Sequence, residues 1–512
     1  MSKSSLIKEK KSSEFDWIAM FVPLGGVVAL GVLFMLIPDQ SAMMLGTIRG
    51  FLGNDMGLYY LLIGVLAFGA TMYIAFSKYG NIKLGGGEKP QYKSFAWGAM
   101  IFTSTMAADI LFFALIEWSL YASEPYMEQL GDMQLWASTY PLFHWGPIAW
   151  GIYIVLAVAF GFMLHVRLRN KQKFSEGCRP LFGNKVDGLL GKVIDTLASF
   201  ALIAGLASSF SLATPLLSAA FSRVFGIGDT VGLTISILIV IALIYTIAVL
   251  IGMKGISKLA TVSVYIFATL LFYFLFLGGE TRYILETGFS AIGNLAQNFF
   301  GMATRTDPLR ETTFTQDWTV FYWAYWMACS VATPFFIGII SKGRTIKNTI
   351  VGAYCWGLAG TFTTFIILGN YGLSQQMKHG IDTVGTIYNY DYSINSSAII
   401  SIFETLPLPA LALVILGINM ILFYSTTLDA MTMVISSYSH KKLMPGQEPD
   451  RRVRAFWAIL FVIFPIALIF SENSLYSLQS VSIIAAFPIG IVITLIVISF
   501  FKDARNFLNK KT

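Results

Sequence analysis

The sequence predicts an all-α integral membrane protein. Of its 512 residues, 56% are hydrophobic and only 12% are charged, whereas soluble domains carry about 25% charged residues. A soluble fold has too little interior to hide so much apolar surface. The apolar residues also form long runs, such as 18–37, 235–253 and 483–501, which approach or exceed the roughly 18 residues of a spanning helix.

These runs predict twelve spanning helices. In chain order they cover 17–37, 57–77, 95–122, 141–166, 189–221, 230–253, 258–279, 317–341, 347–372, 399–438, 454–471 and 475–501. The tenth is too long for one straight helix, and Pro407 and Pro409 predict an entry loop or a kink within it.

The segment 280–304 breaks this pattern. It is compatible with a helix but mixes Arg282, Glu286 and Asn294 with apolar residues. We therefore predict an amphipathic helix at the outer interface, with an ordinary outer loop as the alternative.

The distribution of Lys and Arg predicts the topology. Although the net charge is +7, the basic residues gather in alternate short loops, as in an inner membrane protein, and do not indicate nucleic acid binding. Most of the 35 basic residues face the cytoplasm if both termini do. A full-length span follows the polar start 1–14, so this span is expected to be retained rather than cleaved as a signal peptide. We expect a multi-pass protein of the cell (inner or plasma) membrane with both termini cytoplasmic.

Several classes of function lack their motifs. There is no G-x-x-x-x-G-K-[ST] loop, no H-E-x-x-H and no G-x-S-x-G, which disfavours both ATP-driven transport and an intramembrane enzyme. The cysteines Cys178, Cys329 and Cys355 are not clustered, so neither a disulfide framework nor a metal site is expected. Ion-coupled secondary transport remains, with no cofactor beyond H⁺ or Na⁺ as the coupling ion.

The third predicted span carries a candidate coupling site. Its run Ser104–Ala108 consists mostly of small and hydroxyl residues, which permits a broken helix whose backbone groups can bind an ion or substrate. Asp109 follows directly, and a carboxylate near the bilayer centre is costly enough to be functional by default. The alternative is a structural carboxyl that is protonated or paired. Glu117, two turns later, faces either substrate or water.

The eighth predicted span is rich in Trp and Tyr. Trp318 and Tyr322 fit an interfacial aromatic belt. Tyr325 and Trp326 lie deeper, just before Ser330–Pro334, a second predicted break. Aromatic faces in a desolvated site attract quaternary ammonium groups, although core packing also uses Trp.

The fourth and tenth predicted spans add further candidates. Trp150 and Tyr153 share one helical face, while Trp145 fits an interfacial belt equally well. In the tenth span, Thr426, Thr427 and Asp429 offer oxygen ligands for Na⁺ or interhelical hydrogen bonds.

Three stretches carry a resemblance to a known family. Phe143-His-Trp-Gly, the Trp-rich 318–326 and Ile340-Ser-Lys-Gly-Arg-Thr345 together resemble the betaine/choline/carnitine transporter family. The match runs from the second span through the tenth. It implies twelve spans with a LeuT-like inverted five-plus-five repeat, and usually a homotrimer to which the interfacial helix contributes. The implied organisation is an N-terminal segment with two peripheral spans (1–94), a first repeat of spans 3–7 (95–279), an interfacial helix and loop (280–316), a second repeat of spans 8–12 (317–501) and a short cytoplasmic tail (502–512).

The resemblance also implies a substrate site between spans 4 and 8. Its aromatic box would hold a trimethylammonium-like group and comprises Trp145, Trp150, Tyr153, Tyr325, Trp326 and Cys329. Groups near Ser104–Met106 would serve a substrate carboxylate, which places Met106 in the site. Glu117 joins it because carnitine exchangers keep a Glu at the matching position.

Two departures bear on the substrate and the coupling ion. Family members usually carry large aromatic residues where this chain has Tyr325 and Cys329. Na⁺-coupled betaine carriers have a Gly-rich stretch where this chain has 105–109, whereas an Asp matching Asp109 is typical of choline carriers thought to use protons. The expected function is secondary transport of choline, glycine betaine, carnitine or a related methylated amine, coupled to H⁺ through Asp109. The alternatives are substrate/product antiport of the carnitine type and Na⁺ symport involving Thr426 and Thr427. The expected partners are this small substrate, membrane lipid and two further copies of the chain, and no nucleic acid.

Overall fold

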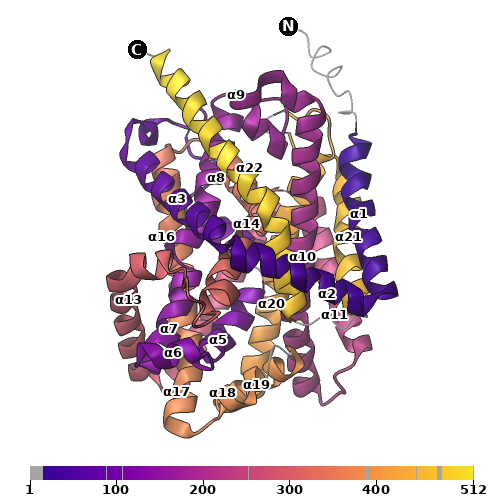
Figure 1. The fold of residues 1–512 in the computed structure, drawn as a ribbon. Coiled ribbons are helices and arrows are strands. Elements are labelled where there is room, and N and C mark those ends of the chain that lie inside the picture. The colour runs from indigo at the N-terminus through magenta and orange to yellow at the C-terminus, as the bar shows by residue number, and fades with distance from the viewer. Residues whose placement is uncertain are drawn as a thin grey trace.

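The computed structural model describes residues 15–87, 89–106, 108–251, 253–387, 392–444, 447–469 and 475–510 (Figure 1). Within these residues the chain is helical, and its β-structure is limited to two isolated bridges, Phe15 with His440 and Lys83 with Thr345. The predicted cytoplasmic segment 1–14 lies outside the described residues, as do the last two residues of the predicted tail. The all-α prediction is confirmed.

The first half of the chain forms long helices joined by short ones. The long helices are α1 (Trp17–Leu36), α3 (Gly57–Phe76), α4 (Ser94–Thr105), α5 (Asp109–Ala122), α7 (Met133–His144), α8 (Pro147–His165), α10 (Leu189–Phe225), α11 (Val231–Ile251) and α12 (Met253–Phe272). The shorter connecting helices are α2 (Pro38–Arg49), α6 (Pro125–Leu130) and α9 (Arg179–Phe182), together with the single-turn segments η3 (Phe174–Cys178) and η4 (Gly183–Asp187).

The second half of the chain also consists of long helices joined by shorter ones. Its helices are α13 (Thr281–Thr304), α14 (Phe321–Cys329), α15 (Thr333–Ile340), α16 (Ile346–Thr364), α17 (Asn370–His379), α18 (Thr383–Thr386), α19 (Tyr392–Glu404), α20 (Pro409–Tyr438), α21 (Arg451–Ile469) and α22 (Leu475–Asn509). The wide helical turn η6 (Thr315–Val320) leads into α14.

Among the described residues, seven helices are long and apolar enough to cross a membrane, and two sharply bent helix pairs raise the number to nine. The three other predicted spans coincide with α1, α11 and α21. A multi-pass membrane protein is therefore confirmed. The count of twelve and the inverted repeat stay predictions.

Several boundaries differ from those predicted. The predicted interruption of the tenth span is confirmed, because α19 ends at Glu404 and α20 begins at Pro409. By contrast, α2 was not predicted, and in Figure 1 it runs across the neighbouring long helices. The predicted tail from residue 502 is helical as far as Asn509, because α22 continues without a break.

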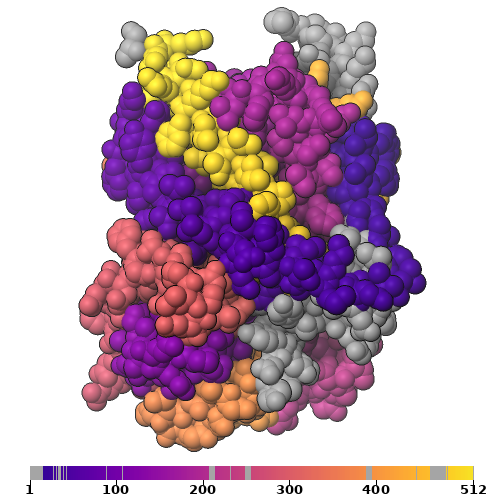
Figure 2. Space-filling view, in the orientation of Figure 1, coloured from indigo at the N-terminus to yellow at the C-terminus, as the bar shows by residue number. Residues whose placement is uncertain are grey.

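The segment 281–304 is helical, as predicted, and forms α13. Its buried residues Ile284, Gly288, Ala291 and Leu295 recur on one face, and Asn294 donates a hydrogen bond to Thr139 of α7 at 3.0 Å. The other faces leave apolar side chains uncovered, with Phe289 81% and Phe300 70% exposed. Figure 2 shows this segment in coral on the outside of the molecule. Its position at a membrane interface stays a prediction.

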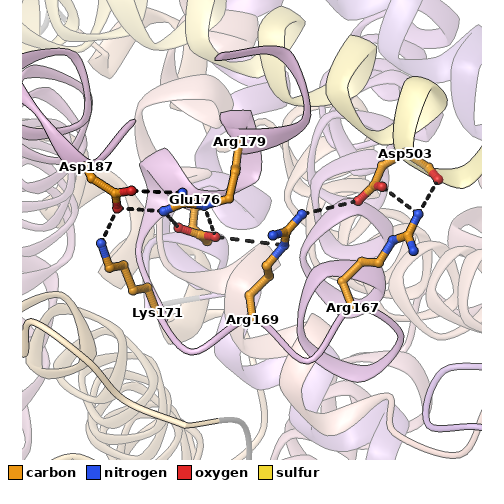
Figure 3. A network of polar contacts seen from close by, with 7 residues as sticks. All are labelled: Arg167, Arg169, Lys171, Glu176, Arg179, Asp187 and Asp503. Atoms are coloured by element: carbon orange, nitrogen blue, oxygen red, sulfur yellow. Dashed lines mark hydrogen bonds and ion pairs between the residues drawn. The ribbon is translucent and has the colours of Figure 1, made fainter. Parts of the chain in front are cut away.

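A network of ion pairs binds the end of α22 to the loop after α8 (Figure 3). Arg167 contacts Asp503 at 2.6 Å, and Arg169 lies 3.9 Å from both Asp503 and Glu176. Arg179 reaches Glu176 and Asp187, and Lys171 also contacts Asp187. Hydrogen bonds from Arg179 and Lys171 hold the pKa of Asp187 well below its usual value. This cluster marks the end of the bundle at which α1 begins and α22 ends.

Candidate substrate and coupling site

The two predicted helix breaks are present and lie against each other. The helices α4 and α5 meet at 65°, and the helical segments 315–329 and 333–340 meet at 54°. The hydroxyl of Thr333, at the second break, donates a hydrogen bond to the carbonyl of Ser104, at the first, over 2.9 Å. The breaks therefore face a common region inside the bundle.

A third break, not predicted, lies within the fourth span. The helix α7 ends at His144 and α8 begins at Pro147, so Trp145 and Gly146 form the junction. A Cβ at Gly146 would lie 2.2 Å from the carbonyl oxygen of Leu142. Any larger residue at this junction would force the backbone to shift.

Three of the predicted box residues surround a fourth, Trp326. Its ring lies 5.8 Å from that of Trp145, 5.9 Å from that of Trp150 and 4.8 Å from that of Tyr153, measured between centroids. All four side chains are at most 3% exposed. We call these four residues, together with Tyr325, which precedes Trp326 in the chain, the aromatic cluster.

Two indole N–H groups of this cluster lack an acceptor. The Nε1 atoms of Trp150 and Trp326 are buried and have no hydrogen-bond partner within the described part of the chain. A buried donor without a partner costs about 1–3 kcal/mol. Ring faces of this kind attract a methylated cation in a desolvated site, and the two N–H groups can donate to an acceptor atom of a ligand.

Cys329 and Met106, the remaining predicted residues of the site near the breaks, lie at the end of α14 and directly after α4. Both are buried, and the sulfur of Cys329 lies where a Cβ added to Gly205 of α10 would approach it to 2.8 Å. The glycine thus lets α10 pack directly on Cys329. Met106 lies at the first break, where its N–H donates to the carbonyl of Phe102 at 2.8 Å.

Asp109 is joined to the aromatic cluster. It begins α5 and is only 4% exposed, and its Oδ2 accepts a hydrogen bond from the hydroxyl of Tyr325. The predicted coupling carboxylate and a predicted substrate-binding residue are therefore in direct contact.

Glu117 is fully buried and is exposed neither to bulk water nor at the surface of the protein. Its Oε2 accepts a hydrogen bond from Trp145 Nε1 at 2.8 Å, and its Oε1 accepts one from the hydroxyl of Tyr121. The sequence left open whether Glu117 faces substrate or water. In this structure the Glu117 side chain is not exposed to water.

Trp318 and Tyr322 do not form an interfacial belt, contrary to the prediction. Both are buried within the protein. Trp318 Nε1 donates to Glu124 at 2.7 Å, and the Tyr322 ring stacks on His144 with centroids 4.8 Å apart. The composition of this span suggested a belt, but the packing of α5 and α7 against it determines where these rings lie.

Thr426 and Thr427 lie next to the first break. Both hydroxyls donate to the carbonyl of Thr103, at 3.2 and 3.1 Å, and so connect α20 to α4. Asp429, one of the oxygen ligands considered for Na⁺, instead pairs with buried Arg454 at 3.2 Å. The structure therefore places the two threonines against α4 and the Asp429 carboxylate against α21.

A cavity of about 1240 Å³ opens between the ends of α8, α15 and α20. Its lining includes Lys78, Lys83, Lys89 and Lys342, with Glu448 as the acidic residue among the described lining side chains. These lysines come from loops predicted to be cytoplasmic. The cavity therefore forms a basic vestibule at one end of the helices that carry the candidate site.

Known proteins resemble this chain over most of its length. The sequence profile of the BCCT, or betaine/carnitine/choline family transporter, matches residues 18–508. A carnitine transporter of Acinetobacter baumannii is 30% identical over 441 residues, which cover 85% of this chain and 78% of the relative. A glycine betaine transporter, OpuD, of Bacillus subtilis is 28% identical over 503 residues, 96% of this chain and 94% of the relative.

Among solved structures, a substrate-bound, outward-open Na⁺-coupled sialic acid symporter is similar with a TM-score of 0.48 and 13% sequence identity. The likeness covers 88% of this chain and 87% of that one.

Proposed function

Because this chain belongs to the betaine/carnitine/choline family of transporters, we propose that it carries a small quaternary ammonium compound across the cell membrane, coupled to protons through Asp109. Members of the family are transporters and not enzymes. The observation that carries the proposal is the hydrogen bond between Tyr325 and Asp109, which joins the aromatic cluster to a buried carboxylate.

The aromatic cluster supports the choice of substrate. A trimethylammonium group donates no strong hydrogen bond, so its recognition relies on ring faces in a desolvated site. Trp326, surrounded by three aromatic rings of span 4, provides such a site. Choline, glycine betaine and carnitine all carry this group.

Proton coupling follows from the place of Asp109. In the proposed cycle its protonated carboxyl replaces a bound Na⁺ and relieves repulsion while the substrate cation occupies the cluster. A buried carboxyl is the residue type that transporters use as a proton relay. Na⁺ symport is the alternative, in which Thr426 and Thr427 supply oxygen ligands.

A second candidate concerns the form of the substrate. The unpartnered N–H groups of Trp150 and Trp326 favour a ligand with an anionic or polar acceptor, such as the carboxylate of betaine or carnitine. A zwitterion of this kind is also the natural substrate of an exchanger. Direct comparison of choline, glycine betaine and carnitine binding to the purified protein separates these possibilities.

Transport into proteoliposomes tests the coupling. Uptake is measured under an imposed pH gradient, an imposed Na⁺ gradient or neither. We expect acid outside to drive accumulation and Na⁺ to change little. Asp109→Asn should abolish proton-driven accumulation and leave exchange. Uptake driven by Na⁺ alone in the unmodified protein would refute the proposal.

We also propose that the protein is a homotrimer with both termini in the cytoplasm, and that α13 contributes to the subunit contact. The exposed Phe289 and Phe300 provide apolar surface for such a contact. The mass of the detergent-solubilised protein and of a Phe289→Ser/Phe300→Ser variant checks the assembly. A monomer in the unmodified protein would exclude it.

A further inference from the structure

A continuous chain of hydrogen bonds crosses spans 3, 4 and 8 beside the aromatic cluster. The hydroxyl of Tyr121 contacts Glu117 Oε1 and also His144 Nδ1, the latter at 2.6 Å. On the other side of the imidazole, Nε2 lies 3.0 Å from the hydroxyl of Thr319. All four side chains are buried. None of the motifs discussed above assigns a role to Tyr121, His144 or Thr319.

The donors in this chain can all point in one direction. When Glu117 is a carboxylate, it accepts from Tyr121, and the Tyr121 oxygen then accepts from Nδ1–H of His144. The neutral imidazole therefore carries its proton on Nδ1, and Nε2 accepts from the Thr319 hydroxyl. Every donor is directed toward Glu117.

We infer that Tyr121 and His144 form a proton relay that loads and unloads Glu117. A proton that binds Nε2 of His144 allows Nδ1 to pass its own proton to the Tyr121 oxygen, while the Tyr121 hydroxyl proton moves to Glu117 Oε1. The products are a carboxylic acid at Glu117, a neutral Tyr121 and a neutral His144 imidazole, which now carries its proton on Nε2 instead of Nδ1. One proton has entered at Nε2 and the Glu117 carboxylate has been neutralised, so charge and atoms balance.

The surroundings suit such a relay. The titratable groups around it are Tyr140 on α7, Tyr322 on α14, Glu124 at the start of α6, and Asp317, two residues before Thr319 in η6. Asp317 pairs with Arg49, and Glu124 accepts from Trp318. No Lys or Arg pairs with Glu117 within the described part of the chain, so no fixed cation holds this carboxylate in its ionised form.

Thr319 forms one end of the relay and is itself buried, at 2% exposure. Thr319 lies two residues from Asp317, whose side chain is 31% exposed. The other end, Glu117, accepts from Trp145, a member of the aromatic cluster. The relay therefore runs from a buried threonine, close in sequence to the partly exposed Asp317, to a residue that contacts the candidate substrate site.

The consequence for binding has a definite sign. A carboxylate at Glu117 favours a nearby cation and makes a charge-assisted bond to Trp145, and protonation weakens both effects. Affinity for a permanently cationic amine should fall as the pH falls. This consequence rests on the proposed substrate class, whereas the relay itself does not.

Infrared difference spectroscopy tests the relay without substrate. Purified protein carrying Asp109→Asn, which removes the other carboxyl near the cluster, is titrated between about pH 5 and 8, the range in which histidine-linked protons exchange. We expect the carbonyl stretch of protonated carboxyls to grow as the pH falls, and the Glu117→Gln variant to lack the component that belongs to Glu117. Tyr121→Phe and His144→Gln should each shift the pH midpoint of that component.

Two matched controls separate the relay from general packing effects. Tyr371→Phe removes a hydroxyl that meets Thr405 at 2.8 Å, and His165→Gln changes a histidine that bonds the carbonyl of Gly338 at 3.0 Å. Both should leave the midpoint unchanged. If His144→Gln does not fold, Tyr121→Phe decides alone, because Phe keeps the ring.

The proposal is overturned if Glu117→Gln removes no component of the carbonyl band, if no carboxyl titrates, or if Tyr121→Phe leaves the midpoint of that component where it was. Binding of a quaternary amine across the same pH range gives a separate readout. Failure to bind any such amine would refute the proposed function, while the infrared result would still decide the relay.

Discussion

Tyr325 donates its hydroxyl hydrogen bond to Oδ2 of Asp109. The first residue belongs to the span that presents Trp326, and the second begins the helix after the break of span 3. A carboxylate that accepts such a bond is stabilised in its charged form, whereas burial favours the neutral form. The protonation state of Asp109 is thereby connected to the position of an aromatic ring in the cluster.

Tyr325→Phe isolates this contact. A hydrogen bond to a charged group contributes about 1.5–3 kcal/mol to stability, so the variant should unfold at lower temperature. Proton-driven uptake should fall more than equilibrium binding, because the ring remains. Thermal unfolding and uptake into proteoliposomes measure both. Tyr371→Phe, remote from the cluster, serves as the control, and equal losses in the two variants would contradict the prediction.

Trp326→Leu and Trp150→Leu should each weaken binding of a quaternary amine. A desolvated cation–π contact is worth roughly 1–2 kcal/mol, which corresponds to an increase in Kd of about 5- to 30-fold. Isothermal calorimetry provides the measurement. The appropriate control is Trp17→Leu, since Trp17 is 59% exposed and lies on α1. Comparable weakening in that variant would show that folding rather than ligand contact was measured.

Gly205→Ala should destabilise the protein although alanine favours helices by about 1 kcal/mol. The added Cβ would lie 2.8 Å from the sulfur of Cys329, and overpacking of this kind costs about 1–3 kcal/mol. Cys329→Ala makes room for the added methyl group. The double variant should therefore lose less stability than the sum of the losses in the two single variants. Additivity within about 0.5 kcal/mol would mean that the two residues are not in contact.

Thr333→Val removes the side-chain hydrogen bond between the two breaks while keeping the side chain's shape. We expect a loss of about 1 kcal/mol of stability and a change in transport rate larger than the change in substrate affinity. Thr349→Val is the matched control, since the Thr349 hydroxyl bonds within its own helix to the carbonyl of Thr345 at 3.0 Å. An unchanged rate in Thr333→Val would argue against a role for this link.

The sequence predicted the breaks of spans 3, 8 and 10 correctly, because small residues and prolines have local effects on the backbone. The meeting of Trp145, Trp150 and Tyr153 with Trp326 was implied by family resemblance. Composition alone left each ring ambiguous. The hydrogen-bond chain through His144 was missed, since its members come from three spans and their pairing depends on tertiary packing. Trp318 was misplaced for the same reason.

The junction at Gly146 was also missed. A proline one residue later is common at helix starts, so Pro147 was a usable signal that the span restarts there. The length of α22 could not be read from hydropathy, because its last turns are charged and are held by the ion pair between Arg167 and Asp503. Hydropathy reports where a helix is apolar and does not report where it ends.

The basic vestibule has an electrostatic consequence. Four lysines and one glutamate among its described lining residues produce a positive potential at the mouth. At physiological ionic strength this potential extends about 8 Å, so mobile anions are concentrated there and mobile cations are depleted. A methylated cation in solution at this end meets a repulsive barrier to entry, whereas a zwitterion with its carboxylate foremost does not. Occupancy of the vestibule should therefore depend on the net charge of a solute and on salt concentration.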